Sequence, residues 1–317
     1  MQISKDTVRC GLHSGQQYSS YPDLLDLWLS AELLGYDWIS LYDHFRPPIG
    51  GPAGPCFEGT TMLAALAAST TSIRCAMLVS AITWRHPAVV AAVAASIDHI
   101  CAGRLEFGLG AASQDLAYEQ YGVPFPAAAT RIGMLDEACN VVRSLWNGGP
   151  VTFRGKYYQL SGAFLSPEPV QRPLPLIIGA EGERSALAVV ARHADTWNCL
   201  AFDPPRYARK LAALARHCAS VGRDIADIRK SVTFRAVLAR DRAEAAERAG
   251  QLRRTASAGW PWHEYLVIGT PQDCLTSLRP YLDLGVRDFV LGARPPLDWT
   301  TIELFASGVA PTLRTRS

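Results

Sequence analysis

The sequence lacks the marks of several classes of protein. It has no basic run longer than pairs such as Arg253-Arg254, and its formal net charge is only +2, so a nucleic-acid groove is not expected. No window reaches the roughly 18 apolar residues of a membrane span, and the start of the chain does not resemble a secretion signal. The eight cysteines form no Cys-x-x-Cys pair, and no histidine cluster has metal-ligand spacing. We expect a cytosolic protein with reduced cysteines, no metal, and neither membrane nor nucleic acid as a partner.

Short apolar runs alternate with longer segments of helical periodicity over nearly the whole chain, which predicts parallel strands joined by helical crossovers. Eight runs are predicted to be strands, at residues 8–12, 38–41, 73–80, 105–110, 176–179, 196–200, 231–238 and 288–291. Eight segments are predicted to be helices, at residues 21–34, 60–70, 87–100, 130–146, 184–191, 204–221, 242–256 and 271–284. Eight βα units favour a closed (β/α)8 TIM barrel over an open doubly wound sheet.

No linker or low-complexity tract divides the chain, so residues 1–317 are expected to form one barrel domain. The segment 148–172 is irregular and contains "VTFRGKYYQL", which is typical of a hairpin. We therefore expect a hairpin excursion from the barrel after the fourth βα unit.

Polar residues follow several predicted strands. Asp43 and His44 come directly after the second strand, and "GLHSGQQ", "LVSAITWRHP" and "EFGLGAASQD" follow or end three others. In a barrel these strand ends meet at one mouth, where the active site lies. The alternative is structural: the histidine caps a backbone carbonyl and the aspartate is a turn or N-cap residue.

The resemblance to a known family rests on several stretches in order: "LGYDWISLYDHF", "LVSAITWRHPAVVAAVAASID", "GRLEFGLGAA", "PLIIGAEGERSALAVVARHADTWN" and "YLVIGTPQDCLTSLRPYLDLGVRDFVL". The chain resembles the luciferase-like flavin and deazaflavin oxidoreductases. Members of that family are TIM barrels that hold FMN or the deazaflavin coenzyme F420 at the barrel mouth. The resemblance also implies a small organic substrate and a homodimer.

In the F420 branch the second strand exits through Asp-His, which matches Asp43 and His44. The resemblance implies that Asp43 contacts the cofactor and that His44 lies by its reacting carbon. Imidazole titrates near neutral pH, so His44 is the candidate general acid or base for hydride transfer. Two alternatives stay open: an FMN-dependent monooxygenase that uses oxygen, and a cofactor-binding barrel without catalysis.

Further cofactor contacts are expected at three strand exits. Small residues after the fourth strand let backbone amides approach a flat ligand, and helix amino termini bind anions, which would suit the cofactor phosphate at "IIGAEGERSA". There Glu181 is expected to point its carboxylate away, leaving the contacts to backbone groups and Ser185; an ordinary βα turn is the alternative. The expected cofactor-binding residues are Asp43, Ser80, Gly110, Ala111, Ala112, Ser113, Ala180, Glu181, Gly182 and Ser185.

The substrate pocket is expected at the same rim, from strand-end residues that are alternatively structural: His13, Gln16, Gln17, Trp84, Tyr118 and Asn198. The sequence departs from the sugar-phosphate branch of the family at two positions. Ser113 stands where that branch has a glutamate proton donor, with Asp115 the nearest carboxylate, and Pro48 stands where it has a tryptophan. Glucose 6-phosphate is therefore not the expected substrate.

Overall fold

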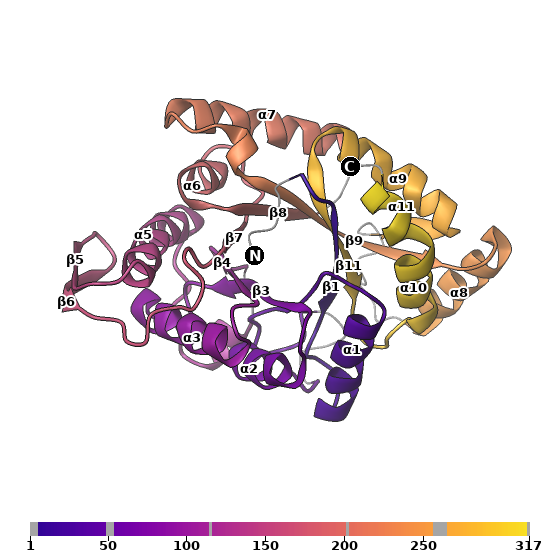
Figure 1. The fold of residues 1–317 in the computed structure, drawn as a ribbon, viewed down its shortest axis with the longest axis horizontal. Helices are drawn as coiled ribbons and strands as arrows, with labels where there is room; N and C mark the ends of the chain where they lie inside the picture. The colour runs from indigo at the N-terminus through magenta and orange to yellow at the C-terminus, as the bar shows by residue number, and fades with distance from the viewer. Residues whose placement is uncertain (1–5, 49–53, 114–115, 201–202, 256–264, 316–317) are drawn as a thin grey trace.

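A closed ring of parallel strands forms the centre of the computed structural model, which describes residues 6–48, 54–113, 116–200, 203–255 and 265–315 (Figure 1). Within these residues eight strands pair side by side around the ring, and the pairing of β8 with β9 closes it. In ring order they are β1 (Arg9–Ser14), β2 (Trp38–Leu41), β3 (Arg74–Ala81), β4 (Leu105–Gly110), β7 (Leu176–Gly179), β8 (Thr196–Leu200), β9 (Arg229–Leu238) and β11 (Val286–Ala293). The predicted (β/α)8 barrel is confirmed.

Helices follow the strands, and most of them pack around the outside of the ring, as Figure 1 shows. They are α1 (Tyr21–Leu33), α2 (Gly59–Ser69), α3 (Pro87–Ile100), α4 (Leu116–Gln120), α5 (Ala128–Trp146), α6 (Ala186–His193), α7 (Pro204–Ser220), α8 (Arg242–Thr255), α9 (Pro271–Asp283), α10 (Trp299–Leu304) and α11 (Ala310–Thr315), with the π-helical turn Phe305–Val309 between the last two and the 3-10 turn Ile225–Asp227 after α7. Sequence signals fix several starts: Ser20 and Asp23 form a capping box before α1. None of the described helices is long and apolar enough to cross a membrane.

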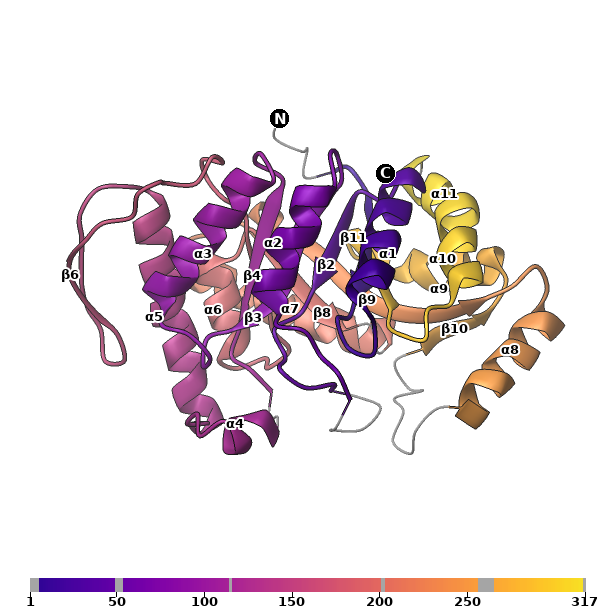
Figure 2. The same cartoon turned by 90° about the horizontal axis from the view of Figure 1, so that it is seen from below.

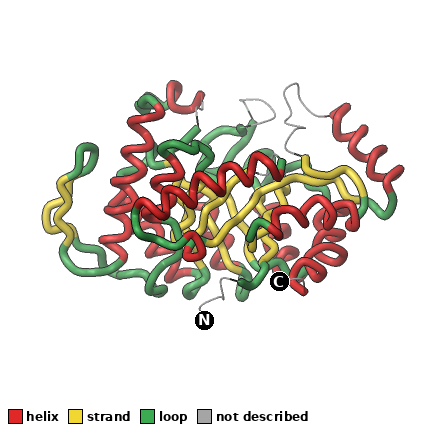
Figure 3. The backbone as a smooth tube through the Cα atoms, turned by 90° about the horizontal axis from the view of Figure 1, so that it is seen from above, coloured by secondary structure: helices red, strands yellow, loops and turns green. Residues whose placement is uncertain are grey.

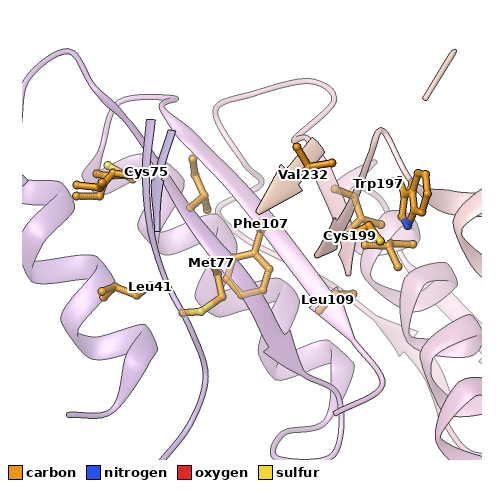
Figure 4. Packing of buried hydrophobic residues seen from close by; sticks show 14 of the residues in the cluster. Leu41, Cys75, Met77, Phe107, Leu109, Trp197, Cys199 and Val232 are labelled. Carbon is orange, nitrogen blue, oxygen red and sulfur yellow. The ribbon is translucent and has the colours of Figure 1, made fainter. Parts of the chain in front are cut away.

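The apolar core has two layers, because alternate strand residues point into the barrel and out toward the helices. Inside lie Trp38, Ala76, Leu78, Ile177 and Val290. Gly11 is required beside the indole of Trp38, since a Cβ at Gly11 would lie 2.5 Å from it. The larger layer lies between strands and helices, where Met77 and Phe107 of neighbouring strands pack together (Figure 4).

A buried ion network occupies the amino ends of the strands. The Arg9 guanidinium donates to both carboxylate oxygens of Glu106 and to both of Asp288, at 2.5 to 3.1 Å. Arg74 adds a bond to Glu106, and Arg229 adds one to Asp288, each of 2.6 Å. Burial raises the pKa of Glu106, but Arg9 and Arg74 lower it more, to about 2. These charges therefore compensate one another at the base of the barrel, far from the strand exits.

Two excursions leave the barrel. The strands β5 (Val151–Arg154) and β6 (Gln159–Ala163) form an antiparallel hairpin after α5, which confirms the predicted hairpin; it stands out from the helices in Figures 2 and 3. On the other side α8 projects away from the ring (Figures 2 and 3). Among the described residues, the following strand β10 (Tyr265–Gly269) pairs only with the far half of β9, outside the ring.

The structure adds elements that the periodicity does not predict, namely α4, β10 and the helices after β11. These are short, and β10 is a strand only because β9 runs on past the ring and offers a free edge. The helix expected from residue 184 begins at Ala186. Asp115 lies outside the described residues.

Candidate active site at the carboxyl ends of the strands

A cavity of about 670 Å³ opens at the carboxyl ends of the ring strands, and all eight strands or their exits contribute to its walls. It brings together most of the sequence-predicted residues: His13, Asp43, His44, Trp84, Gly110, Ala111, Ala112, Ser113, Tyr118, Ala180, Glu181, Gly182 and Asn198. Four others do not line it: Gln16, Gln17, Ser80 and Ser185. Pro48 also lines the cavity.

Asp43 is fixed by three donors. Its Oδ2 accepts bonds from the Ser80 hydroxyl at 2.8 Å, the Ala81 amide at 3.2 Å and the Arg85 guanidinium at 2.7 Å. Arg85 also pairs with Glu58 at 2.5 Å. The other oxygen, Oδ1, is buried and accepts no hydrogen bond from any residue that the structure describes. Ser80 therefore orients the aspartate instead of lining the cavity.

His44 lies next to Asp43 on the β2 exit, half-buried on the cavity wall. Its ring meets the Tyr42 ring edge to face, with centroids 5.2 Å apart. The amide of Gln16, which is fully buried, donates to the carbonyl of Tyr42 at 2.7 Å and to that of His44 at 3.5 Å. Gln16 thus holds the backbone that carries the Asp-His pair. The side chain of Cys56 donates to the same His44 carbonyl at 3.3 Å.

Two polar residues near the carboxyl ends of β1 and β8, His13 and Asn198, line the cavity. The His13 Nδ1 lies 2.8 Å from the Ser40 hydroxyl. Burial lowers the pKa of His13 first, and the nearby charges of Arg294, Arg235 and His44 lower it further, to about 3. His13 is therefore neutral near pH 7. Across the ring the Asn198 amide donates to the hydroxyls of Ser231 and Thr233, at 2.9 and 3.0 Å.

Small residues at the β4 exit leave a flat wall. The Val79 side chain lies over this strand, since a Cβ at Gly110 would lie 2.6 Å from it. Beyond Gly110 the chain turns through Ala112 with φ of 64°, a left-handed conformation that residues with a Cβ seldom adopt. Arg131 donates to the Ala111 carbonyl at 2.8 Å and fixes the turn. The β4 exit is thus held in place, and the small residues Ala111, Ala112 and Ser113 line the cavity beside it.

The turn at the β7 exit, which the sequence predicts to hold the cofactor phosphate, lines the cavity in part. Ala180, Glu181, Gly182 and the first helical residue Ala186 line the cavity, but the Ser185 side chain is exposed and caps nothing. Behind this turn the Lys210 ammonium is buried and donates to the Glu181 carbonyl at 2.5 Å. It supplies a positive charge that the strand-end rule did not find, because Lys210 belongs to a helix far along the chain.

Aromatic rings build the wall by β3. Trp84 stacks on Tyr118 with centroids 3.8 Å apart, and Phe45 meets Trp84 edge to face at 4.7 Å. The Tyr118 hydroxyl lies 2.5 Å from that of Thr83, which ties α4 to the β3 exit. Trp84 therefore packs the rim and lines the cavity at once.

The arginines of the site that were not predicted include Arg85, Arg235 and Arg294. Arg85 stands in the quoted stretch "LVSAITWRHP", but its partner Asp43 lies 42 residues away. Arg294 follows a strand exit and the strand-end rule could have found it. Arg235 lies inside a predicted strand, so no local signal distinguishes it from a core residue.

Comparisons with known proteins place this geometry in a family. Residues 3–265 match the model of the luciferase-like monooxygenases. The chain is 27% identical to an F420-dependent glucose-6-phosphate dehydrogenase of Microbacterium testaceum, with 98% of each chain covered. Its fold resembles a solved F420-dependent secondary alcohol dehydrogenase (TM-score 0.82, 20% identity, 97% and 99% of the two chains covered). It also resembles a long-chain alkane monooxygenase (TM-score 0.83, 14% identity, 98% and 92% covered). The chain belongs to the luciferase-like monooxygenase family.

Proposed function

We propose that this chain is an F420-dependent oxidoreductase that moves a hydride between the deazaflavin and a small organic substrate. The observation that carries the proposal is the Asp43-His44 pair on the cavity wall, with the buried Oδ1 of Asp43 left without a donor among the residues that the structure describes. A buried acceptor of this kind is costly unless a ligand satisfies it. The names of full-length relatives, which are F420-dependent dehydrogenases, support the same cofactor.

The residues present fit a planar, anionic cofactor. Asp43 would accept a hydrogen bond from the ring system, with Ser80 and Arg85 holding it in place. The wall from Gly110 to Ser113 would lie against the rings, and the turn from Ala180 to Gly182 would face the phosphate with backbone amides, helped by the charge of Lys210. Ser185, being exposed, is left out of this set.

The protein's part in the chemistry is positioning and proton handling. Bound F420 supplies a hydride acceptor or donor. When the substrate is oxidised, His44 would take up the proton that the substrate loses. In the reverse direction His44 would return that proton. Tyr42 packs against the imidazole and Gln16 fixes its backbone, so the ring is held for this role. Ser113 and Pro48 on the wall support a substrate other than glucose 6-phosphate.

A titration of the purified chain with F420 and, separately, FMN tests the proposal. Trp84 lies on the cavity wall, so intrinsic fluorescence should report binding. Tight binding of F420 and weak binding of FMN is the expected result. Preferred binding of FMN, with oxygen uptake in the presence of reduced flavin, would instead establish the monooxygenase. Tight F420 binding without turnover across a broad substrate screen would support a non-catalytic barrel.

We further propose a cytosolic homodimer with no nucleic-acid partner. All eight cysteines are unpaired by disulfides, as in a reducing compartment. Small residues of α2 and α3 form a shallow apolar hollow, flanked by Val89 and Ile100, whose exposed fractions are 51% and 49%. Light scattering should give a dimer that Val89→Glu weakens, while the exposed α7 variant Arg216→Gln leaves it intact. A monomeric wild type would refute the dimer.

A further inference from the structure

A buried polar pair joins two neighbouring strands inside the barrel. His13 of β1 and Ser40 of β2 lie opposite each other in the strand register, and the His13 Nδ1 is 2.8 Å from the Ser40 hydroxyl. Trp38, two residues before Ser40, belongs to the core inside the ring, and alternate residues of a strand share one face. Ser40 therefore also points inward, and its partner His13 lines the cavity.

The second ring nitrogen of His13, Nε2, forms no hydrogen bond with any residue that the structure describes. Only 7% of His13 is exposed, and a polar atom so far removed from water is costly to leave without a partner. Asn198 differs, because its amide nitrogen donates to the hydroxyls of Ser231 and Thr233, and its oxygen accepts from Thr233 at 3.4 Å. Of these two cavity residues, His13 is the one that keeps a polar atom for a ligand.

The imidazole of His13 is neutral near pH 7. Burial lowers its pKa first, and nearby charges, that of Arg294 foremost, lower it further, to about 3. A neutral imidazole carries a single ring proton, so one nitrogen donates a hydrogen bond and the other accepts one. The role of Nε2 therefore depends on which nitrogen holds the proton.

The Ser40 hydroxyl decides the position of that proton. Among the described residues its acceptors are Nδ1 of His13 at 2.8 Å and the Leu12 carbonyl at 3.5 Å. If Nδ1 held the proton and donated to Ser40, the buried hydroxyl would have to donate over the longer distance, at the limit of a hydrogen bond. Donation from Ser40 to Nδ1 uses the shorter contact. It therefore favours a proton on Nε2, which becomes a donor for a ligand in the cavity.

His13 lines the same cavity as His44, the proposed proton-transfer residue. The Tyr42 ring lies next to both, with its centroid 5.9 Å from that of His13 and 5.2 Å from that of His44. His13 is buried and held by Ser40, whereas His44 is half-buried on the wall. A small substrate can therefore meet a fixed hydrogen-bond donor and a separate residue for proton transfer in one part of the cavity.

We propose that Nε2 of His13 donates a hydrogen bond to the oxygen on the reacting carbon of the substrate, which is a hydroxyl in the reduced form and a carbonyl in the oxidised form. On oxidation the C–H bond breaks and its hydride passes to bound F420, the O–H bond breaks and its proton passes to His44, and the C=O bond forms. The oxygen keeps the hydrogen bond from His13 in both states. In the reverse direction the neutral imidazole polarises the carbonyl. This inference rests on the proposed function and names the substrate group that His13 recognises.

Two variants separate this role from a structural one. An asparagine amide stands as many bonds from Cα as Nδ1 does, and a glutamine amide as many as Nε2 does. His13→Asn therefore keeps a partner for Ser40, and His13→Gln keeps a donor for the cavity. His13→Gln should bind a carbonyl probe nearly as well as the wild type, and His13→Asn should bind it about tenfold less tightly. A purely structural role predicts the reverse order.

The probe is cyclopentanone, titrated into the chain saturated with oxidised F420, which has no hydride to give it. Chlorocyclopentane, of similar size but with chlorine in place of the oxygen, is the control ligand. Nitrogen NMR of protein labelled in its histidine rings reports both the tautomer and the binding, and the His13 resonances are those missing from His13→Gln. They should show the proton on Nε2, and the Nε2 resonance should shift saturably with cyclopentanone but not with chlorocyclopentane.

Three results would overturn the inference: a proton on Nδ1, no saturable shift of Nε2 with cyclopentanone, or wild-type affinity for cyclopentanone in a folded His13→Asn. Loss of F420 affinity in both variants would assign His13 to the cofactor, which also overturns it. If His13→Asn fails to fold, the wild-type titration and His13→Gln decide the question. Failure of the wild type to bind F420 would refute the proposed function separately, and the cyclopentanone titration would then be read on the cofactor-free chain.

Discussion

Replacement of Asp43 by asparagine should weaken F420 binding while preserving the fold. Three donors converge on Oδ2, from Ser80, Ala81 and Arg85. The amide must keep its oxygen there to satisfy them, so its nitrogen takes the place of Oδ1. The amide nitrogen, a hydrogen-bond donor, then replaces the buried acceptor Oδ1 of the carboxylate. Losing one charge-assisted bond costs about 1.5–3 kcal/mol, or roughly tenfold to a hundredfold in Kd.

The assay is the fluorescence titration of Asp43→Asn with F420, beside a denaturation curve. The control is Glu58→Gln, which alters the other partner of Arg85 but does not line the cavity. It should bind F420 nearly as well as the wild type. Wild-type affinity in Asp43→Asn, with the fold intact, would show that no ligand donor meets Oδ1 and would refute this account of the cofactor site.

Three further predictions follow from the same structure. His44→Ala should lower kcat about 10²- to 10⁴-fold with F420 affinity nearly unchanged; unaltered turnover would remove His44 from the mechanism. Glu106, with its pKa depressed to about 2, should contribute about 3 kcal/mol of stability above pH 4.5, lost as the pH falls toward 2. In urea unfolding, the free energy of unfolding should therefore fall less between pH 4.5 and pH 2 in Glu106→Gln than in the wild type. An equal dependence on pH in the two proteins would count against the ion network. Gly110→Ala places a Cβ 2.6 Å from the Val79 side chain and should cost about 1–3 kcal/mol. Adding Val79→Ala should restore part of that loss in a denaturant titration; no recovery would disprove the contact.

Local patterns carried much of the prediction. The alternation of short apolar runs and helical segments is a property of neighbouring residues, so it predicted the eight ring strands and the hairpin within a few residues. The strand-end rule also brought His13, Asp43, His44 and Asn198 to one cavity, because parallel strands all end at the same face of a barrel. Predicting these residues required only their positions at the ends of their own strands, and not which strands pair across the ring.

Pairing across the ring decided the rest. The residues next to Ser80 and Gln16 in the chain do not show whether these two side chains line the cavity or hold other site residues in place. Only the register of β3 against β2 places the Ser80 hydroxyl on Asp43. Likewise Arg235 reads as one more strand residue until β9 is set beside Gly292 of β11. The sequence by itself determined the barrel and most of the candidate residues that line its mouth. The tertiary structure decided which side chains form ion pairs or hydrogen bonds with each other, because those contacts join residues tens to hundreds of positions apart.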